Sequence, residues 1–259
     1  IWAWGSGRVK KMARRTDRVL VILPFEKEFY RKAGVKAEYV GNPLLESLPQ
    51  GFDREQTAVS LGLDPKEKII GLLPGSRLAE VRRILPKMLQ AASLLKDKLN
   101  RVQFLLPLAA NLDGRTVDEF ISQGPVSVKV VKGPAHKAVA LSDLVIVTSG
   151  TATLEAALLA RPMVVVYEVS PLSYALGVKF VKLKEYSLAN LVLGKRVVPE
   201  LIQRRFTPEN TFNEAYRILT EPGRYQGTMA ELKRVRAILG EAQPSKRVAQ
   251  IVWEMLQEN

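Results

Sequence analysis

Short, continuous apolar runs alternate with longer helical patterns along most of the chain. The runs fall at residues 18–23, 37–40, 68–73, 102–106, 127–131, 144–147 and 163–167, and each is a predicted strand. Such runs lack a polar face, as expected of parallel strands that helices cover on both sides. The series predicts an α/β fold with a Rossmann-like, doubly wound parallel sheet. From Pro199 onward we find no strand signal and expect three helices.

Turn-forming residues divide this series. Gly41-Asn42-Pro43 and Pro49-Gln50-Gly51 indicate a linker between two parts of the chain. Pro86 predicts a kink or a break in the helical region that ends near Lys98. A chain of 259 residues has room for about two domains.

The amino-acid composition limits the kinds of catalysis and metal binding that we expect of this chain. Cysteine is absent and His136 is the one histidine, so thiol catalysis, disulfides and a zinc or histidine metal site are not expected, and no cofactor is signalled. The longest apolar stretches last about eleven residues, whereas a membrane-spanning helix needs about 20. The 39 Lys and Arg residues against 26 Asp and Glu residues give a net charge of +13. That excess implies an anionic partner, which could be phosphates, nucleic acid or an acidic membrane surface.

Two loops follow predicted strands directly and suit a phosphate. In the first, Gly75 lets the backbone approach a ligand, Ser76 precedes a helix start, and Arg77 offers a bidentate fork. An ordinary turn with a surface arginine is an equally good local interpretation. The chain has no Walker sequence, which argues against a P-loop ATPase.

The second loop, Thr148 to Glu155, again places small residues at a helix start. Glu155 lies in an apolar stretch of that helix and needs a partner, because an unpaired buried carboxylate is costly. A ribose diol is one candidate partner, and a salt bridge to Arg161 is the alternative. Two such loops in one sheet favour a nucleotide site.

Four other sequence features are weaker evidence for a functional site. Asn190 is a polar residue in an apolar run, but a capped helix with surface charges explains its surroundings equally well. His136 is more often a structural residue at a helix start than a ligand. The basic segment with Arg8, Lys10, Lys11, Arg14, Arg15 and Arg18 includes Trp2 and Trp4, which suits an anionic membrane surface, nucleic acid or plain solvent. A second stretch, residues 174–184, mixes apolar residues with lysines and could be interfacial or a core helix.

Taken together, the motifs resemble the lipid-A-disaccharide synthase family of GT-B glycosyltransferases. The resemblance depends on the order and spacing of several motifs over nearly the whole chain. They are Ile1-Trp2-Ala3-Trp4, Leu23-Pro24-Phe25-Glu26, Tyr39-Val40-Gly41-Asn42-Pro43, Leu73 to Arg77 with Glu80, Ser149 to Glu155, and Ser187 to Leu191 through Glu200. Many members of the family have His where this chain has Asn42.

The resemblance implies a reaction without metal or cofactor. Diacylglucosamine would pass from UDP-2,3-diacylglucosamine to 2,3-diacylglucosamine 1-phosphate (lipid X), giving the β-1,6-linked lipid A disaccharide 1-phosphate and UDP. It also implies a cytoplasmic enzyme, peripheral on the anionic inner membrane of a Gram-negative-type bacterium, with no nucleic-acid partner; a homodimer is one assembly it allows. Another UDP-GlcNAc-dependent GT-B transferase or epimerase is the first alternative, and a basic nucleic-acid-binding protein the second.

The family's site residues carry over by position. Gly75, Ser76 and Arg77 would hold the diphosphate of the UDP donor, and Glu80 would be a further donor-binding residue. Ser149, Gly150 and Thr151 would contact phosphate at a helix start, and Glu155 would accept the ribose hydroxyls. Asn190 and Arg196 would lie near the donor sugar and phosphates.

The family also implies a domain division. Residues 1–48 would end an N-terminal acceptor domain, residues 49–225 would form the UDP-sugar donor domain, and residues 226–259 would return to the first domain. Relatives carry a long segment before the Trp-Ala-Trp motif, and the Asp regarded as catalytic lies in it. We therefore expect this chain to be a fragment without turnover of its own, and no catalytic base is named in it.

Overall fold

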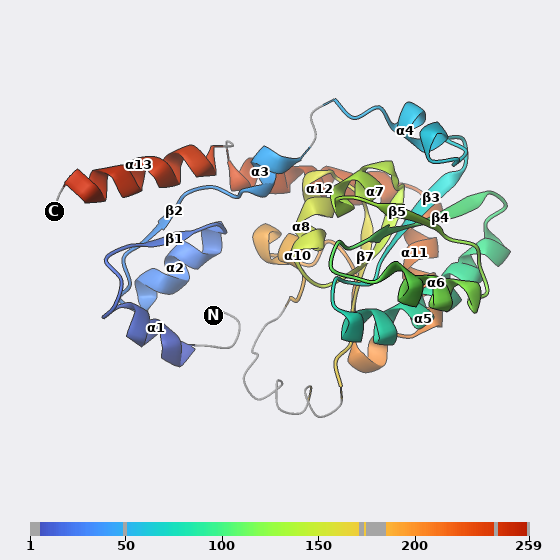
Figure 1. Cartoon of the computed structure of the whole chain (residues 1–259), viewed down its shortest axis with the longest axis horizontal. Helices are drawn as coiled ribbons and strands as arrows, with labels where there is room; N and C mark the ends of the chain where they lie inside the picture. Colours follow the sequence, from blue (N-terminus) through green and yellow to red (C-terminus); the bar gives the residue numbers. More distant parts are fainter. Residues whose placement is uncertain (1–5, 49–50, 171–173, 175–184, 241–242, 258–259) are drawn as a thin grey trace. The chain divides into compact units, whose positions relative to one another are not determined.

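The computed structural model describes residues 6–48, 51–170, 174, 185–240 and 243–257. These residues fall into two compact units, which are considered separately (Figure 1). The sheet unit comprises residues 51–170 and 185–233. The small unit comprises residues 6–48 with residues 234–240 and 243–257.

The sheet unit is built on six parallel strands in the order β5-β4-β3-β6-β7-β8. Their bounds are β3 (Lys68–Leu73), β4 (Val102–Leu108), β5 (Lys129–Lys132), β6 (Leu144–Thr148), β7 (Met163–Tyr167) and β8 (Glu200–Ile202). From β3 to β5, each new strand is added on one side of β3. The chain then returns to the other side of β3, where β6, β7 and β8 are added in turn. The doubly wound sheet predicted from the sequence is thus confirmed, and the direction reverses between β3 and β6.

One strand was not predicted. β8 (Glu200–Ile202) pairs in parallel with β7, although no strand was expected beyond Pro199. It has three residues, and the first of them is a charged residue that is 4% exposed, so its sequence carries no apolar run. Pairing with β7, and not local propensity, defines this strand.

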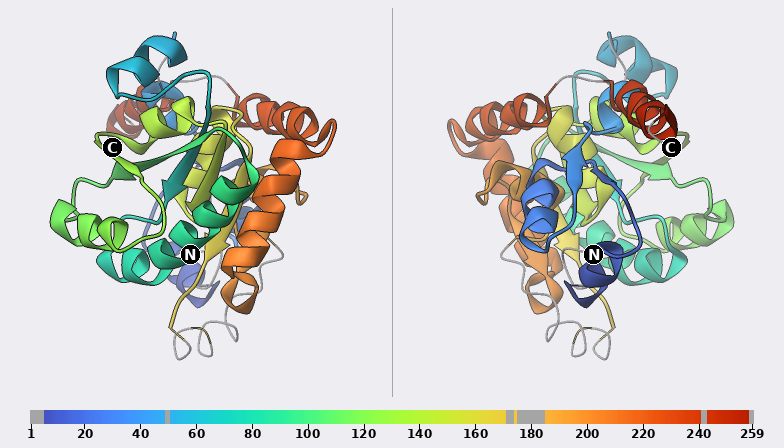
Figure 2. Two further views of the ribbon diagram at one scale, coloured as in Figure 1. Left: turned by 90° about the vertical axis from the view of Figure 1, so that its right-hand side faces the viewer. Right: turned by 90° about the vertical axis from the view of Figure 1, so that its left-hand side faces the viewer.

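Helices cover both faces of the sheet (Figure 2). One face carries α5 (Leu78–Lys98), α6 (Gly114–Ser122) and α11 (Pro208–Thr220). The other carries α4 (Arg54–Ser60), α7 (Ala135–Leu141), α8 (Thr151–Leu158) and, beside α8, α10 (Leu188–Leu193). The 3-10 helix η1 (Gln203–Arg205) follows β8, and α12 (Arg224–Leu239) runs from the sheet unit into the small unit.

Neighbouring residues of β3 point to opposite faces, as the pleat requires. Ile70 joins the core under α5 and α11, whereas Ile69 packs with the residues of α4 and α7. α5 runs through Pro86 as one helix of 21 residues, so of the two predicted effects of this proline the break does not occur. Its buried face, with Leu85 and Leu89, offsets the single hydrogen bond that the proline removes.

The small unit joins segments from both ends of the chain. It contains α1 (Ser6–Met12), β1 (Val19–Val21), α2 (Pro24–Lys32), β2 (Ala37–Tyr39), α3 (Leu44–Ser47) and α13 (Pro244–Gln257), and β1 pairs in parallel with β2. The Tyr39 hydroxyl donates a hydrogen bond of 2.7 Å to the carbonyl of Leu239. None of the described helices of either unit has the length and apolarity to cross a membrane.

Candidate functional site

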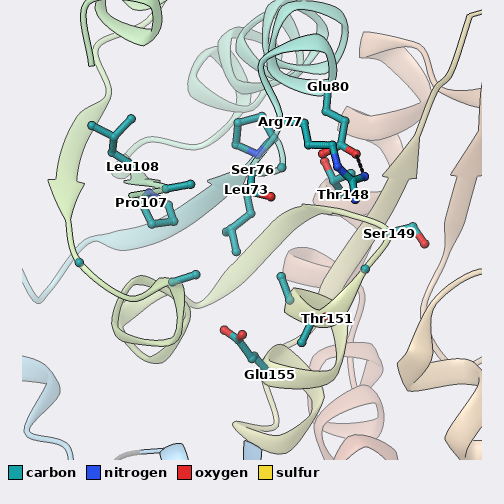
Figure 3. Close-up of a pocket in the computed structure, with 17 residues that line it drawn as sticks. Leu73, Ser76, Arg77, Glu80, Pro107, Leu108, Thr148, Ser149, Thr151 and Glu155 are labelled. Atoms are coloured by element: carbon teal, nitrogen blue, oxygen red, sulfur yellow. Dashed lines mark hydrogen bonds and ion pairs between the residues drawn. The ribbon is translucent and has the colours of Figure 1, made fainter. Parts of the chain in front are cut away.

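A pocket of about 380 Å³ opens at the carboxyl ends of four neighbouring strands of the sheet unit (Figure 3). It lies at the reversal between β3 and β6, where doubly wound sheets bind their ligands. Its lining comes from residues 73–77 and Glu80 after β3, residues 107–109 at the end of β4, Gly133 and Ala135 after β5, and residues 148–152 with Glu155 after β6.

The loop after β3 depends on Gly75, whose φ is +107°. The backbone angle favours glycine, and a Cβ atom at this position would lie 2.5 Å from Oε2 of Glu80, so that the glutamate side chain would have to shift. The next residue is also fixed, because the side-chain amide of Asn111 donates a 2.7 Å hydrogen bond to the carbonyl of Ser76. The loop is therefore held open towards the pocket before any ligand arrives.

Arg77 follows as the N-cap residue of α5, with extended backbone angles. Its Nη1 donates to Oε1 of Glu80 at 2.8 Å, the contact drawn as a dashed line in Figure 3. The arginine side chain is 78% exposed, whereas that of Glu80 is 17% exposed. An exposed guanidinium at a helix start can bind an anionic ligand there.

The loop after β6 is tied to neighbouring segments by hydroxyl groups. Ser149 Oγ donates to the carbonyl of Tyr186 at 2.8 Å. Thr153 Oγ1 donates to the carbonyl of Gly150 at 2.7 Å and accepts from the backbone N–H of Leu188 at 3.1 Å. Thr151 and Ala152, the first residues of α8, line the pocket. The first backbone N–H groups of a helix have no intrahelical acceptor and favour an anion.

Two polar side chains of the pocket have buried atoms without partners. Thr148 is 5% exposed and its Oγ1 has no hydrogen bond, and Oε2 of Glu155 has none either. Burial raises the pKa of Glu155. No ion pair joins Glu155 to Arg161 among the described residues, so the salt-bridge alternative fails. Arg161 instead donates from Nη2 to the carbonyl of Ala140 at 2.8 Å. Buried polar atoms left unsatisfied are rare and mark places where a ligand can supply the missing partner.

Asn190 lies elsewhere, in a cluster whose hydrogen bonds are complete. Its Nδ2 donates to the carbonyl of Val198 and to Oε1 of Glu200, both at 2.9 Å. Its Oδ1 accepts from the backbone N–H groups of residues 197 and 198. Glu200 also accepts from the backbone N–H groups of residues 186 and 187. We call Asn190, Glu200 and these four backbone positions the Glu200 cluster; neither side chain lines the pocket.

Arg196 and His136 are not among the pocket residues. Nε of Arg196 pairs with Oε2 of Glu185 at 2.9 Å, and this hydrogen bond raises the pKa of the arginine. Burial, followed by the charge of Lys137, lowers the pKa of His136.

Of the ten residues predicted to bind the donor, eight thus line one pocket and two, Asn190 and Arg196, do not.

Sequence reasoning missed Thr148 as a binding residue and the residues at the end of β4, and after β5 it considered His136 but not Gly133 and Ala135. Only their position could have indicated them, because the four predicted strands beside the pocket all end at one edge of a doubly wound sheet. Gly133 and Ala135 carry no distinctive chemistry, and Thr148 was taken only as the start of a loop. Among the described residues no group of three or more His, Cys, Asp or Glu side chains could hold a metal ion.

Comparisons with known proteins fit this arrangement. The chain is 42% identical over 256 residues to a lipid-A-disaccharide synthase of Geobacter metallireducens, covering 99% of this chain and 67% of the relative. It is 41% identical to that of Myxococcus xanthus, with the same coverage.

Two solved structures are similar in fold at low identity. A UDP-GlcNAc 2-epimerase from Neisseria meningitidis bound to UDP-GlcNAc has a TM-score of 0.58 at 16% identity, covering 90% of this chain and 59% of that one. WaaG, a glycosyltransferase involved in lipopolysaccharide biosynthesis, has a TM-score of 0.55 at 12% identity, covering 83% and 57%. The fold is thus of the expected GT-B type.

A family model described as lipid-A-disaccharide synthetase matches residues 1–253, which is nearly the whole chain. Together with the relatives at about 40% identity, this match settles the family. The chain therefore belongs to the lipid-A-disaccharide synthase family, and it is a hexosyltransferase of lipid A biosynthesis.

Proposed function

We propose that the pocket binds the UDP part of UDP-2,3-diacylglucosamine, the donor whose sugar is transferred to lipid X. The observation that carries this proposal is the meeting of two loops, after β3 and after β6, around unpartnered atoms of Thr148 and Glu155. A pocket at this point of the sheet, with a cation and two helix starts, suits a nucleotide diphosphate. Two structural neighbours, an epimerase and an MnaA structure, hold UDP-GlcNAc or UDP.

Each pocket residue then has a role. The backbone of Gly75, Ser76 and residues 149–151 contacts the diphosphate, and Arg77 provides the charged fork. Glu155 accepts the ribose hydroxyls, which supply the donors that its Oε2 lacks. Binding therefore relieves the cost of a buried, unpartnered carboxylate.

The same groups assist the reaction. Negative charge develops on the diphosphate as the bond to the sugar breaks. Arg77 and the starts of α5 and α8 stabilise that charge, and they are oriented before the reaction begins. The acceptor hydroxyl must also lose its proton to a base. We assign this step to the family segment that precedes the Trp-Ala-Trp motif in relatives, not to a residue of the pocket.

The domain roles follow from this assignment. The sheet unit is the donor domain, and the small unit is the part that belongs with the acceptor domain. The basic segment faces an anionic membrane surface, with Lys11, Arg14 and Arg15 exposed on the small unit. Trp2 and Trp4 lie outside the described residues, as does all of the 174–184 stretch except Tyr174. Sedimentation with vesicles of phosphatidylglycerol, compared with neutral vesicles, tests this surface.

Calorimetric titration of the 259-residue chain with UDP tests the central proposal. We expect saturable binding that uridine alone reproduces only weakly, because uridine lacks the diphosphate. A folded chain that binds neither UDP nor UDP-GlcNAc would exclude the pocket as the donor site. Lipid A disaccharide formation by this chain alone would contradict the assignment of the base to another segment.

A further inference from the structure

The pocket has an unusual charge balance for a site that binds an anion. The charged side chains of its described lining are one cation, Arg77, and two carboxylates, Glu80 and Glu155. The cation is already engaged, since Glu80 accepts a hydrogen bond from its guanidinium. We propose that Glu80 is a positioning residue that holds Arg77 until UDP arrives, and that the incoming diphosphate displaces this carboxylate from the guanidinium.

The position of the Glu80 carboxylate supports this exchange. Glu80 is the third residue of α5, so its carboxylate lies at the start of a helix, where an anion is stabilised. Its Oε1 is 2.8 Å from Nη1 of Arg77, and its Oε2 lies where a Cβ on Gly75 would come within 2.5 Å. The carboxylate of Glu80 thus lies against the loop and pairs with the cation, and both are groups that suit a phosphate.

The two partners differ in their freedom to move. Arg77 is 78% exposed and Glu80 is 17% exposed, so the arginine can turn towards a ligand while the glutamate stays against the loop. An ion pair whose cation is largely exposed to solvent is weak. A diphosphate carries more charge and accepts a bidentate fork, so it competes well for the guanidinium. When UDP leaves, Glu80 takes Arg77 back.

This inference rests on the proposed function and changes one part of it. Glu80 was predicted to contact the donor together with Arg77. In the exchange it opposes the diphosphate instead, because both are anions. The carboxylate therefore weakens UDP binding and speeds UDP release, which a residue that only supports the loop would not do.

The experiment compares Glu80→Gln with the unchanged chain. Calorimetry should give a dissociation constant for UDP about fivefold lower in the variant, and stopped-flow displacement should give slower release. The dissociation constant for uridine should not change. Glu28→Gln is the matched control, since Glu28 forms a similar pair with Arg31 at 2.8 Å, three residues away, in the small unit. This control removes the same charge and should leave UDP binding unchanged.

Each other outcome is decisive. Weaker UDP binding by a folded Glu80→Gln would mean that Glu80 assists the ligand, and unchanged binding would mean that no competition exists; both overturn the inference. If the glutamine variant does not fold, Glu80→Asp tests the same point, because its shorter side chain withdraws from Arg77. Failure of the unchanged chain to bind UDP would overturn the proposed function itself, which is a separate result.

Discussion

Two glutamates of the sheet unit, buried Glu200 and half-buried Glu155, show opposite environments. Glu200 is 4% exposed and accepts hydrogen bonds from two backbone N–H groups and from Asn190. Glu155 has a buried oxygen without a partner, and its burial raises its pKa. The chain satisfies the first carboxylate completely and leaves the second unsatisfied. Complete satisfaction is typical of a group that maintains the fold, whereas the missing partner of Glu155 is one that the proposed ligand would supply.

Replacing Glu200 should have the largest effect. Glu200→Leu leaves three donors buried without an acceptor and should lower the free energy of unfolding by about 4 kcal/mol. Urea denaturation followed by circular dichroism measures this loss. Glu200→Gln is the control, because its carbonyl retains one acceptor and should cost less. A loss below about 1 kcal/mol in the leucine variant would show that the cluster is not structural.

Arg77→Ala should damage binding and spare the fold. Losing a charge-assisted contact of about 2 kcal/mol raises the dissociation constant for UDP about thirtyfold. Calorimetry measures the change, and the urea midpoint should stay constant. Arg101→Ala is the matched control: Arg101 precedes β4 at the opposite edge of the sheet and is 69% exposed beside Glu67. Equal losses in both variants would attribute the effect to net charge.

Glu155→Gln should separate stability from binding. Because the pKa of Glu155 is raised above 4.5, the folded chain keeps a proton that the unfolded chain has lost. Its contribution to stability therefore falls as the pH rises from about 4.5 through the folded-state pKa. The variant lacks this titration, so its stability advantage over the unchanged chain should grow over that range. Urea denaturation at a series of pH values measures it.

At a pH above the folded-state pKa of Glu155, the same variant should bind UDP about tenfold more weakly, because an amide replaces the charged acceptor of the ribose hydroxyls. As the pH falls through the pKa of Glu155, the ratio of the two affinities should approach one. A variant that is less stable than the unchanged chain at neutral pH would contradict the comparison with Glu200.

The smallest effect is expected at Thr148. Thr148→Val keeps the shape and removes an unpartnered hydroxyl, so the free energy of unfolding should stay equal or rise by up to about 1 kcal/mol. UDP affinity should fall about threefold if the hydroxyl meets the ligand. Thr153→Val is the matched control in α8, since that hydroxyl has two partners and its loss should destabilise the chain by about 1–2 kcal/mol. Equal destabilisation by both variants would show that Thr148 has a partner in solution.

Some parts of the fold and of the pocket could be predicted from the sequence because their signals are local. The strand Lys68–Leu73 was predicted to the residue, because a continuous apolar run between Lys and Pro is a local signal. The pocket followed from topology, since strand ends of one sheet meet at one edge.

Contacts between different segments of the chain could not be predicted from the sequence. Glu200 lies in β8 and Asn190 lies in α10, and the strand β8 forms by pairing with β7, which no local apolar run indicates. The alternative of a Glu155–Arg161 salt bridge failed for a related reason. Arg161 lies beyond the end of α8, and its guanidinium reaches the carbonyl of Ala140.

Every described residue that lines the pocket belongs to the sheet unit. A nucleotide bound there adds its free energy only to conformations in which that unit is folded. At a ligand concentration 100 times the dissociation constant, this addition is about 2.7 kcal/mol. UDP should therefore slow amide hydrogen exchange throughout the six-stranded sheet and leave exchange in β1 and β2 unchanged, so that the nucleotide reports on the folding of one unit of the chain.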